Sequence, residues 1–85
     1  MTVGLRLFAT AREAAGRGAD EYAEGEVPTV AALLDAAVAR YGADFAAVLG
    51  TARIWVNGDE PESGSETKLR AGDEVAVLPP VSGGA

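Results

Sequence analysis

Cysteine and histidine are both absent from this 85-residue sequence. Without cysteine, the chain can form neither a disulfide framework nor a Cys-x-x-Cys metal site. Without histidine, it also lacks the commonest general base and the commonest metal ligand. We therefore expect a protein that is not an enzyme in its own right and that holds no metal and no bound cofactor.

Long apolar runs and excess positive charge are also missing. No stretch approaches the roughly 18 apolar residues that would span a bilayer, and the opening MTVGLRLFA lacks the features of a signal peptide. We expect a cytoplasmic protein. The net charge of −6 argues against nucleic-acid binding, because the phosphates would be repelled. It favours either a protein partner with a basic surface or a role in solubility alone.

The first third of the chain predicts two strands and a short helix. Alternation of Val3, Leu5 and Leu7 indicates a half-buried strand over residues 1–9. The run from Thr10 to Glu13 fits a capping box at a helix start, and glycines at 16 and 18 end that helix. An edge strand is expected around Tyr22, within residues 21–27.

The middle of the chain predicts the longest helix. TVAALLDAAVARYG carries apolar residues at three- and four-residue steps, which places them on one helical face. Thr29 can cap its start, and Gly42 stands where a left-handed residue ends a helix. One further helical turn is expected over residues 44–49.

The last third predicts strands at residues 53–56, 68–70 and 74–78, the first of which runs into a tight Asn57-Gly58 turn. A mixed sheet accommodates this order of elements if the helices pack on one face. The predicted fold class is therefore an α+β roll with four to five strands, one long helix and short helical turns. We expect one domain over residues 1–80 and a flexible tail over residues 81–85.

An apolar patch is predicted on the sheet face that the helices leave open. If the core residues of the strands point toward the helices, alternation sends Phe8, Trp55 and Leu78 outward. Contiguous apolar surface of this kind is more often a binding site than an accidental exposure. We call these three residues the apolar patch. The acidic run of Asp59, Glu60, Glu62 and Glu66 has no calcium-loop spacing and is interpreted as a solvated turn.

The sequence closes on VLPPVSGGA, a thin segment with little to bury. Its prolines favour an extended conformation, and the part from Pro79 to Gly84 can reach about 18–20 Å. Two glycines without Cβ atoms could pass through a narrow channel. Such an arm is suited to delivering a carboxylate into another protein's active site, although terminal glycines can also be frayed ends.

LRLFATAREAAG, TVAALLDAAVARYG and LRAGDEVAVLPPVSGG resemble the MoaD/ThiS family of ubiquitin-like sulfur carriers. The similarity is greatest to the small subunit of molybdopterin synthase and covers nearly the whole chain, with the poorest agreement at residues 18–26 and in the acidic loop. The resemblance implies a β-grasp fold. It also implies that a ubiquitin-activating-type adenylyltransferase uses ATP to activate the Gly84 carboxylate, which then becomes a thiocarboxylate.

The resemblance further implies how the chain meets its partners. Phe8 and Leu78 match apolar positions of the family's docking surface, and Trp55 joins them by periodicity alone. The tail residues Pro80, Val81 and Gly83 are expected to contact the partner. The acceptor of sulfur is a synthase subunit or another biosynthetic enzyme, with molybdopterin formation the nearest resemblance and thiamine, cysteine or a secondary metabolite as alternatives.

Ala85 departs from the family, whose active members end on the second glycine. Three interpretations stay open: a peptidase removes Ala85, Ala85 is a cloning artefact, or the protein has left the sulfur pathway. Two other functions also stay open. One is a β-grasp interaction module without sulfur transfer, and the other is a protein modifier in which Gly84 is joined to a lysine of another protein.

Overall fold

The computed structural model describes residues 1–80. The predicted tail contacts Val81 and Gly83, the predicted reactive residue Gly84, and Ala85 lie outside the described residues. Strands, helices and short 3-10 helices (η) follow one another along the chain as β1 (Thr2–Leu7), α1 (Ala9–Ala15), β2 (Ala19–Ala23), η1 (Glu24–Glu26), α2 (Val30–Tyr41), α3 (Ala43–Leu49), β3 (Arg53–Val56), η2 (Gly64–Glu66) and β4 (Glu74–Leu78).

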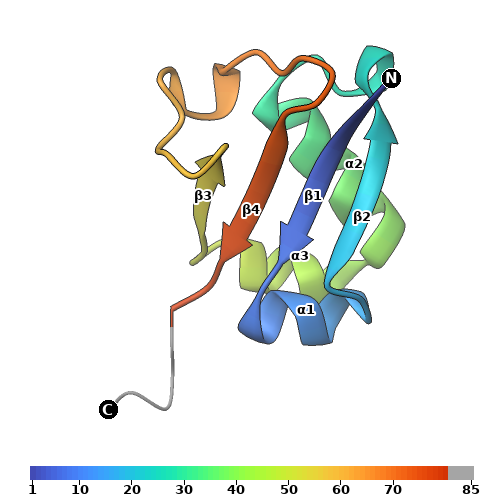
Figure 1. Ribbon diagram of the computed structural model, residues 1–85. Helices are drawn as coiled ribbons and strands as arrows, with labels where there is room; N and C mark the ends of the chain where they lie inside the picture. The colour runs from blue at the N-terminus through green and yellow to red at the C-terminus, as the bar shows by residue number, and fades with distance from the viewer. Residues whose placement is uncertain (81–85) are drawn as a thin grey trace.

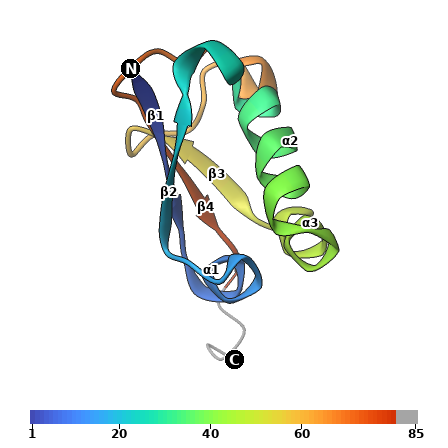
Figure 2. The ribbon, with the colours of Figure 1, turned by 90° about the vertical axis from the view of Figure 1, so that its right-hand side faces the viewer.

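The four strands form one mixed sheet in the order β2-β1-β4-β3 (Figure 1). The central pair β1 and β4 is parallel, whereas β2 and β3 pair antiparallel at the two edges. The first and last strands of the chain are therefore neighbours in the middle of the sheet. Helix α2 crosses one face of the sheet, and within residues 1–80 the opposite face carries no helix (Figure 2). The predicted α+β roll with helices on one face is confirmed.

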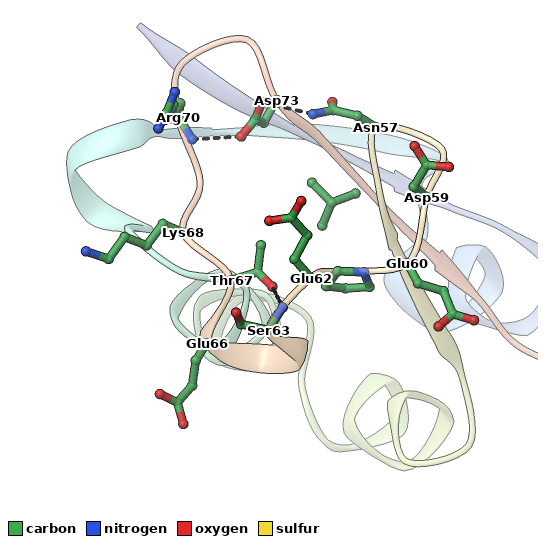
Figure 3. A pocket seen from close by; sticks show the side chains of 12 residues that line it. Asn57, Asp59, Glu60, Glu62, Ser63, Glu66, Thr67, Lys68, Arg70 and Asp73 are labelled. Atoms are coloured by element: carbon green, nitrogen blue, oxygen red, sulfur yellow. Dashed lines mark hydrogen bonds between the residues drawn. The ribbon is translucent and has the colours of Figure 1, made fainter.

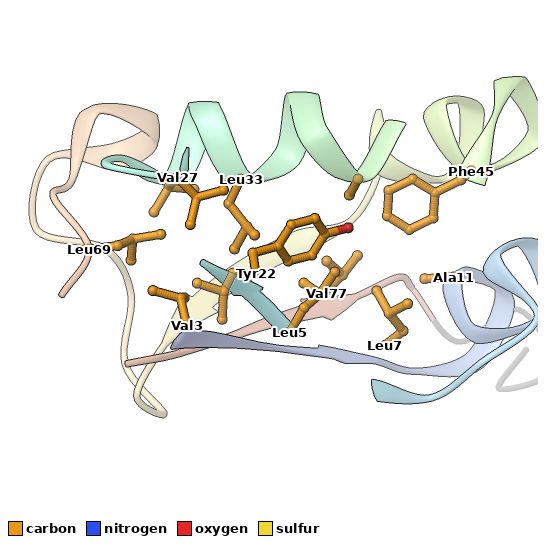
Figure 4. Close-up of a cluster of buried hydrophobic side chains, with 13 residues drawn as sticks. Val3, Leu5, Leu7, Ala11, Tyr22, Val27, Leu33, Phe45, Leu69 and Val77 are labelled. Carbon is orange, nitrogen blue, oxygen red and sulfur yellow. The ribbon is translucent and has the colours of Figure 1, made fainter. Parts of the chain in front are cut away.

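The core lies between the sheet and α2, with α1 and α3 closing one end (Figure 4). Strand alternation sends Val3, Leu5 and Leu7 inward, each at most 2% exposed, and β4 contributes Val75 and Val77 in the same way. The remaining buried apolar residues are Ala11, Tyr22, Val27, Val30, Leu33, Ala37, Phe45 and Leu69. Burial of these side chains supplies the main driving force for the fold.

Helix α2 is built as its sequence predicts. The Thr29 hydroxyl accepts a hydrogen bond from the Ala32 N–H at 3.1 Å, which satisfies one of the free donors at the helix start. At the other end, Gly42 has φ 101° and its N–H donates to the Val38 carbonyl. With ψ at −168°, Gly42 is not a left-handed helical cap, because it also leads directly into α3.

The predicted capping box at Thr10 is wrong. Helix α1 begins at Ala9, the N-cap is Phe8, and no side chain caps the helix. The early start is possible because Ala9 adopts φ 49°, a left-handed value that turns the chain immediately after β1. Thr10 thus lies inside the helix. At the C-terminal end, Gly16 is left-handed at φ 76° and ends the helix as predicted.

Two predicted strands also differ from the structure. The strand around Tyr22 lies earlier, at Ala19–Ala23, because the Leu7 N–H already pairs with the Gly18 carbonyl at the exit of the turn. Residues 68–70 form no strand. Here the Leu69 N–H donates to the Pro28 carbonyl, and Lys68 makes a single bridge to Thr29. This segment therefore fastens the start of α2, with Leu69 buried beneath it.

Asp20 fastens the edge strand β2 to α2, a role that the sequence did not indicate. Its carboxylate accepts hydrogen bonds from Arg40 at 2.7 Å, from the Tyr41 hydroxyl at 2.5 Å and from the Glu21 N–H at 2.8 Å. Burial alone would raise the pKa of Asp20, but these hydrogen bonds and the charge of Arg40 outweigh it and hold the pKa at about 2. Burial and the bond to Asp20 raise the pKa of Tyr41.

Candidate partner-docking surface

Strand register brings the apolar patch together on the sheet face that carries no helix. Trp55 pairs with Ala76, and two residues further along β4, Leu78 pairs with Arg53. Phe8 follows Leu7, which is the register partner of Val77. Leu78 and Trp55 therefore stand on neighbouring strands, and Phe8 directly follows β1, the other neighbour of β4, at the end where β4 finishes. Because Val75 and Val77 are buried, alternation along β4 places Leu78 on the opposite, outer face.

The three residues of the apolar patch differ in exposure. Phe8 is 44% exposed, whereas Trp55 and Leu78 are only partly exposed. These two share a shallow apolar hollow with Thr51, Arg53, Pro79 and Pro80. The hollow was not predicted, because it depends on β3 and the residues before it lying beside the segment that follows β4. Thr51 and Pro79 line it without any sequence signal that marked them.

The chain leaves the sheet beside this hollow. Pro79 is buried and Pro80 is exposed, so the segment turns from the sheet toward the solvent between these two residues. The Phe8 N–H donates to the Val77 carbonyl at 3.3 Å, which fixes β4 against the end of β1 just before the exit. Pro80 thus lies at the margin of the apolar patch, where a partner that covers the patch would meet it.

One ion pair lies in the middle of the same sheet face. Arg6 Nε and Glu74 Oε2 are 3.2 Å apart, and the two side chains are 53% and 54% exposed. A pair this exposed contributes little to stability. Its place matters more, because it separates the apolar patch from the half of the sheet face that carries Gly4 and Glu21.

The acidic loop forms a second, polar hollow at the opposite end of the molecule (Figure 3). Glu62 points toward its middle, while Glu60 and Glu66 point away from it. Within residues 1–80, no group of three or more acidic side chains is placed to hold a metal ion. Asp73 lies on its rim, where hydrogen bonds from Asn57 Nδ2 and the Arg70 N–H lower its pKa. Asp73 therefore closes a turn, in line with a solvated loop.

The sequence matches the ThiS family over residues 5–84. The chain belongs to the ThiS family. No curated protein sequence matches it. Within residues 1–80, no helix is both long enough and apolar enough to cross a membrane.

Solved structures similar to this ThiS-family chain carry the ubiquitin-like β-grasp fold. SAMP1 from Haloferax volcanii is 31% identical with a TM-score of 0.83, over 99% of this chain and 100% of that one. The proposed subunit 1 of molybdopterin converting factor from Pyrococcus furiosus is 27% identical with a TM-score of 0.81, over 95% and 99%. The resemblance to MoaD/ThiS proteins is thus confirmed, and the fold is that of sulfur carriers and ubiquitin-like modifiers.

A third structure holds a relative in complex with a partner. It contains subunits 1 and 2 of the molybdopterin-converting factor of Helicobacter pylori, at 24% identity, a TM-score of 0.69 and coverage of 99% and 100%. At that identity the likeness carries the fold alone. In that structure the Helicobacter pylori subunit 1 is bound to subunit 2. Members of the ThiS family are small carrier or modifier proteins.

Proposed function

We propose that this protein is a sulfur carrier whose Gly84 carboxylate is adenylated and then converted to a thiocarboxylate. The observation that carries the proposal is the exit of the chain at Pro79 and Pro80, directly beside Trp55 and Leu78. Phe8 stands close by, since its N–H donates to the Val77 carbonyl. A partner that covers the apolar patch meets the departing segment at the same time. The sequence then continues through Val81 and Ser82 to Gly83 and Gly84.

The chemistry needs no reactive side chain of the carrier. A carboxylate oxygen of Gly84 attacks the α-phosphorus of ATP, and pyrophosphate leaves. A hydrosulfide-level sulfur nucleophile then attacks the acyl carbon of the adenylate, the C–O bond to phosphate breaks, and AMP leaves with the electron pair. The product is a thiocarboxylate, formed without oxidation or reduction. This route suits a chain without cysteine or histidine.

The partners follow from these steps. An adenylyltransferase of the ubiquitin-activating type uses ATP, and a synthase subunit or another biosynthetic enzyme receives the sulfur. Molybdopterin formation is our first choice of pathway, because the relative at 27% identity is a proposed subunit 1 of molybdopterin converting factor. Ala85, with anything that follows it, must be removed by a peptidase before Gly84 can react. ATP supply puts the reaction in the cytoplasm.

The test is the intact mass of three chains that end at Gly84, at Ala85 and at Ser82. Each is incubated with ATP, sulfide and the adenylyltransferase of the same cells. The chain ending at Gly84 should gain the mass of one sulfur-for-oxygen exchange, and the other two should not. An unchanged mass for all three would refute the proposal, as would native protein that keeps Ala85 and an ordinary carboxylate while the pathway runs.

A protein modifier is the second candidate, favoured by the 31% identity to SAMP1, a small archaeal modifier protein by name. In that case a lysine amine attacks the Gly84 adenylate, AMP leaves, and an isopeptide bond forms. Cells would then contain conjugates that carry the C-terminal peptide of this chain on lysines of other proteins. An interaction module without activation predicts instead that loss of both glycines leaves partner binding intact.

A further inference from the structure

The charge of this protein is divided between the two ends of the sheet. At the end where β1 and β4 finish, which we call the tail end, four arginines face three carboxylates: Arg12, Arg17, Arg40 and Arg53 against Glu13, Asp20 and Asp44. At the opposite end (Figure 1), which we call the loop end, the sequence has seven carboxylates against Lys68 and Arg70. The ion pair of Arg6 and Glu74 lies between the ends, as do Glu21 and Asp35. The tail end thus carries +1 within a chain of net charge −6.

Two of the arginines at the tail end are available to a partner. Arg17 and Arg40 pair with Asp20 at 3.4 Å and 2.7 Å. Arg12 and Arg53 form no ion pair within residues 1–80. Arg53 is exposed and lines the apolar hollow together with Trp55 and Leu78. A free cation therefore stands at the margin of the apolar patch.

Because salt screens distant charges, a partner at the tail end interacts with these arginines and only weakly with the carboxylates of the loop end. Strand β4, with five residues, separates the two ends by about 16 Å at about 3.3 Å per residue. The Debye length in physiological salt is about 8 Å. Charges of the loop end are therefore largely screened at the apolar patch, while Arg53 is in direct contact with it.

We propose that the apolar patch and Arg53 together dock onto a partner surface in which an apolar pocket is bordered by carboxylates. The occupant is the enzyme that adenylates Gly84, so the inference rests on the proposed function. Phe8, Trp55 and Leu78 supply the apolar contact, and Arg53 acts as a positioning residue that orients the chain. Charge complementarity at the rim of an interface sets association rate and register more than total affinity. The acidic loop end then points away from the acidic partner.

The electrostatic potential at the apolar patch is tested first without any enzyme. The measurement is quenching of the fluorescence of Trp55, the sole tryptophan of the sequence. Iodide and caesium ions serve as probes at constant ionic strength, each referred to its quenching of N-acetyltryptophanamide. Arg53→Glu and Lys68→Glu form a matched pair, because both change the net charge from −6 to −8. In the wild-type chain, iodide should quench Trp55 more strongly than caesium does. Arg53→Glu should lower iodide quenching about twofold, because it changes the charge about 7 Å from Trp55 by two units.

Lys68→Glu should leave iodide quenching nearly unchanged, since Lys68 lies at the loop end. Equal effects of the two variants, or no preference for iodide in the wild-type chain, would overturn the inference whatever the function of the protein.

Docking is tested by the rate of pyrophosphate release when the adenylyltransferase acts on chains ending at Gly84. Arg53→Glu should raise KM about tenfold, a difference of the size expected for one rim charge, with kcat unchanged. Lys68→Glu should alter KM less than twofold, and Arg53→Lys should recover most of the loss. Equal KM values for Arg53→Glu and Lys68→Glu would overturn the docking inference and leave the proposed function standing. No pyrophosphate release from the wild-type chain would overturn the proposed function, and the docking role with it.

Discussion

Replacing Asp20 with asparagine should lower the free energy of unfolding by about 2 kcal/mol at pH 7. The pKa of Asp20 falls from 3.8 to about 2 in the folded chain, and one pKa unit corresponds to about 1.4 kcal/mol. The carboxylate is well shielded, with only 12% of the side chain exposed, so solvent screens this contribution little. The asparagine variant keeps the size of the side chain and removes the charge that Arg40 and Tyr41 bind.

The sign of the pH dependence follows from the direction of the shift. A carboxyl group whose pKa is lower in the folded state stabilises the fold at every pH above its unfolded pKa. The contribution of Asp20 is therefore complete above pH 3.8 and is lost as the pH falls toward about 2. Wild-type stability should decline across this window, and the decline should be smaller in Asp20→Asn.

Urea unfolding followed by Trp55 fluorescence measures both effects, at pH 7 and at several values between pH 5 and pH 2. Glu21→Gln is the matched control, because Glu21 is the next residue on β2 and its side chain is exposed. Tyr41→Phe, which removes one donor to Asp20, should cost about 1 kcal/mol and should shift the acid decline to higher pH. A loss below about 0.5 kcal/mol in Asp20→Asn, within the range of ordinary surface changes, would refute the proposed clamp.

Three further substitutions, with Phe8→Ala as a control, test the core, the long helix and the strained turn. Phe45→Ala should lower the free energy of unfolding by about 3–5 kcal/mol, because Phe45 is fully buried. Phe8 is exposed, so Phe8→Ala should lower it by under 1 kcal/mol in urea unfolding. Similar losses for the two variants would contradict the assigned burial. Thr29→Ala should cost about 1 kcal/mol, since it removes the bond to the Ala32 N–H, and an unchanged urea midpoint would argue against that cap. Ala9→Gly should raise the free energy of unfolding by about 0.5 kcal/mol, because relief of φ 49° slightly exceeds the entropy that glycine adds to the unfolded chain; a lower melting temperature would contradict this.

Periodicity predicted the parts of the fold in which one face is buried and the other is not. Helix α2 and strands β3 and β4 were located correctly, because apolar residues recur at the step of each element. The outward set of Phe8, Trp55 and Leu78 followed from the same alternation. These three residues form one surface because β1, β4 and β3 are neighbours in the sheet order β2-β1-β4-β3. No local sequence pattern encodes that order.

The errors occurred where long-range contacts decide the local structure. Thr10 satisfies the capping-box pattern, but the left-handed backbone of Ala9 turns the chain directly after β1, and the helix starts two residues sooner than that pattern requires. Asp20 lies on the same side of β2 as the buried Tyr22. Its inward orientation depends on hydrogen-bond donors of Arg40 and Tyr41, about twenty residues away in the chain. A carboxylate on the buried side of a strand is unexpected until those donors are known.

The parallel pairing of β1 with β4 joins residues about seventy positions apart in the chain. Pairings of such long range form slowly, because a large loop must close before any contact offsets its entropy. Phe8, Trp55 and Leu78 come from the beginning, the middle and the end of the sequence, and they become neighbours only once β4 has been inserted. An enzyme that requires all three would reject unfinished and misfolded chains. Surface recognition would then serve as quality control, and ATP would be spent only on carriers that have completed folding.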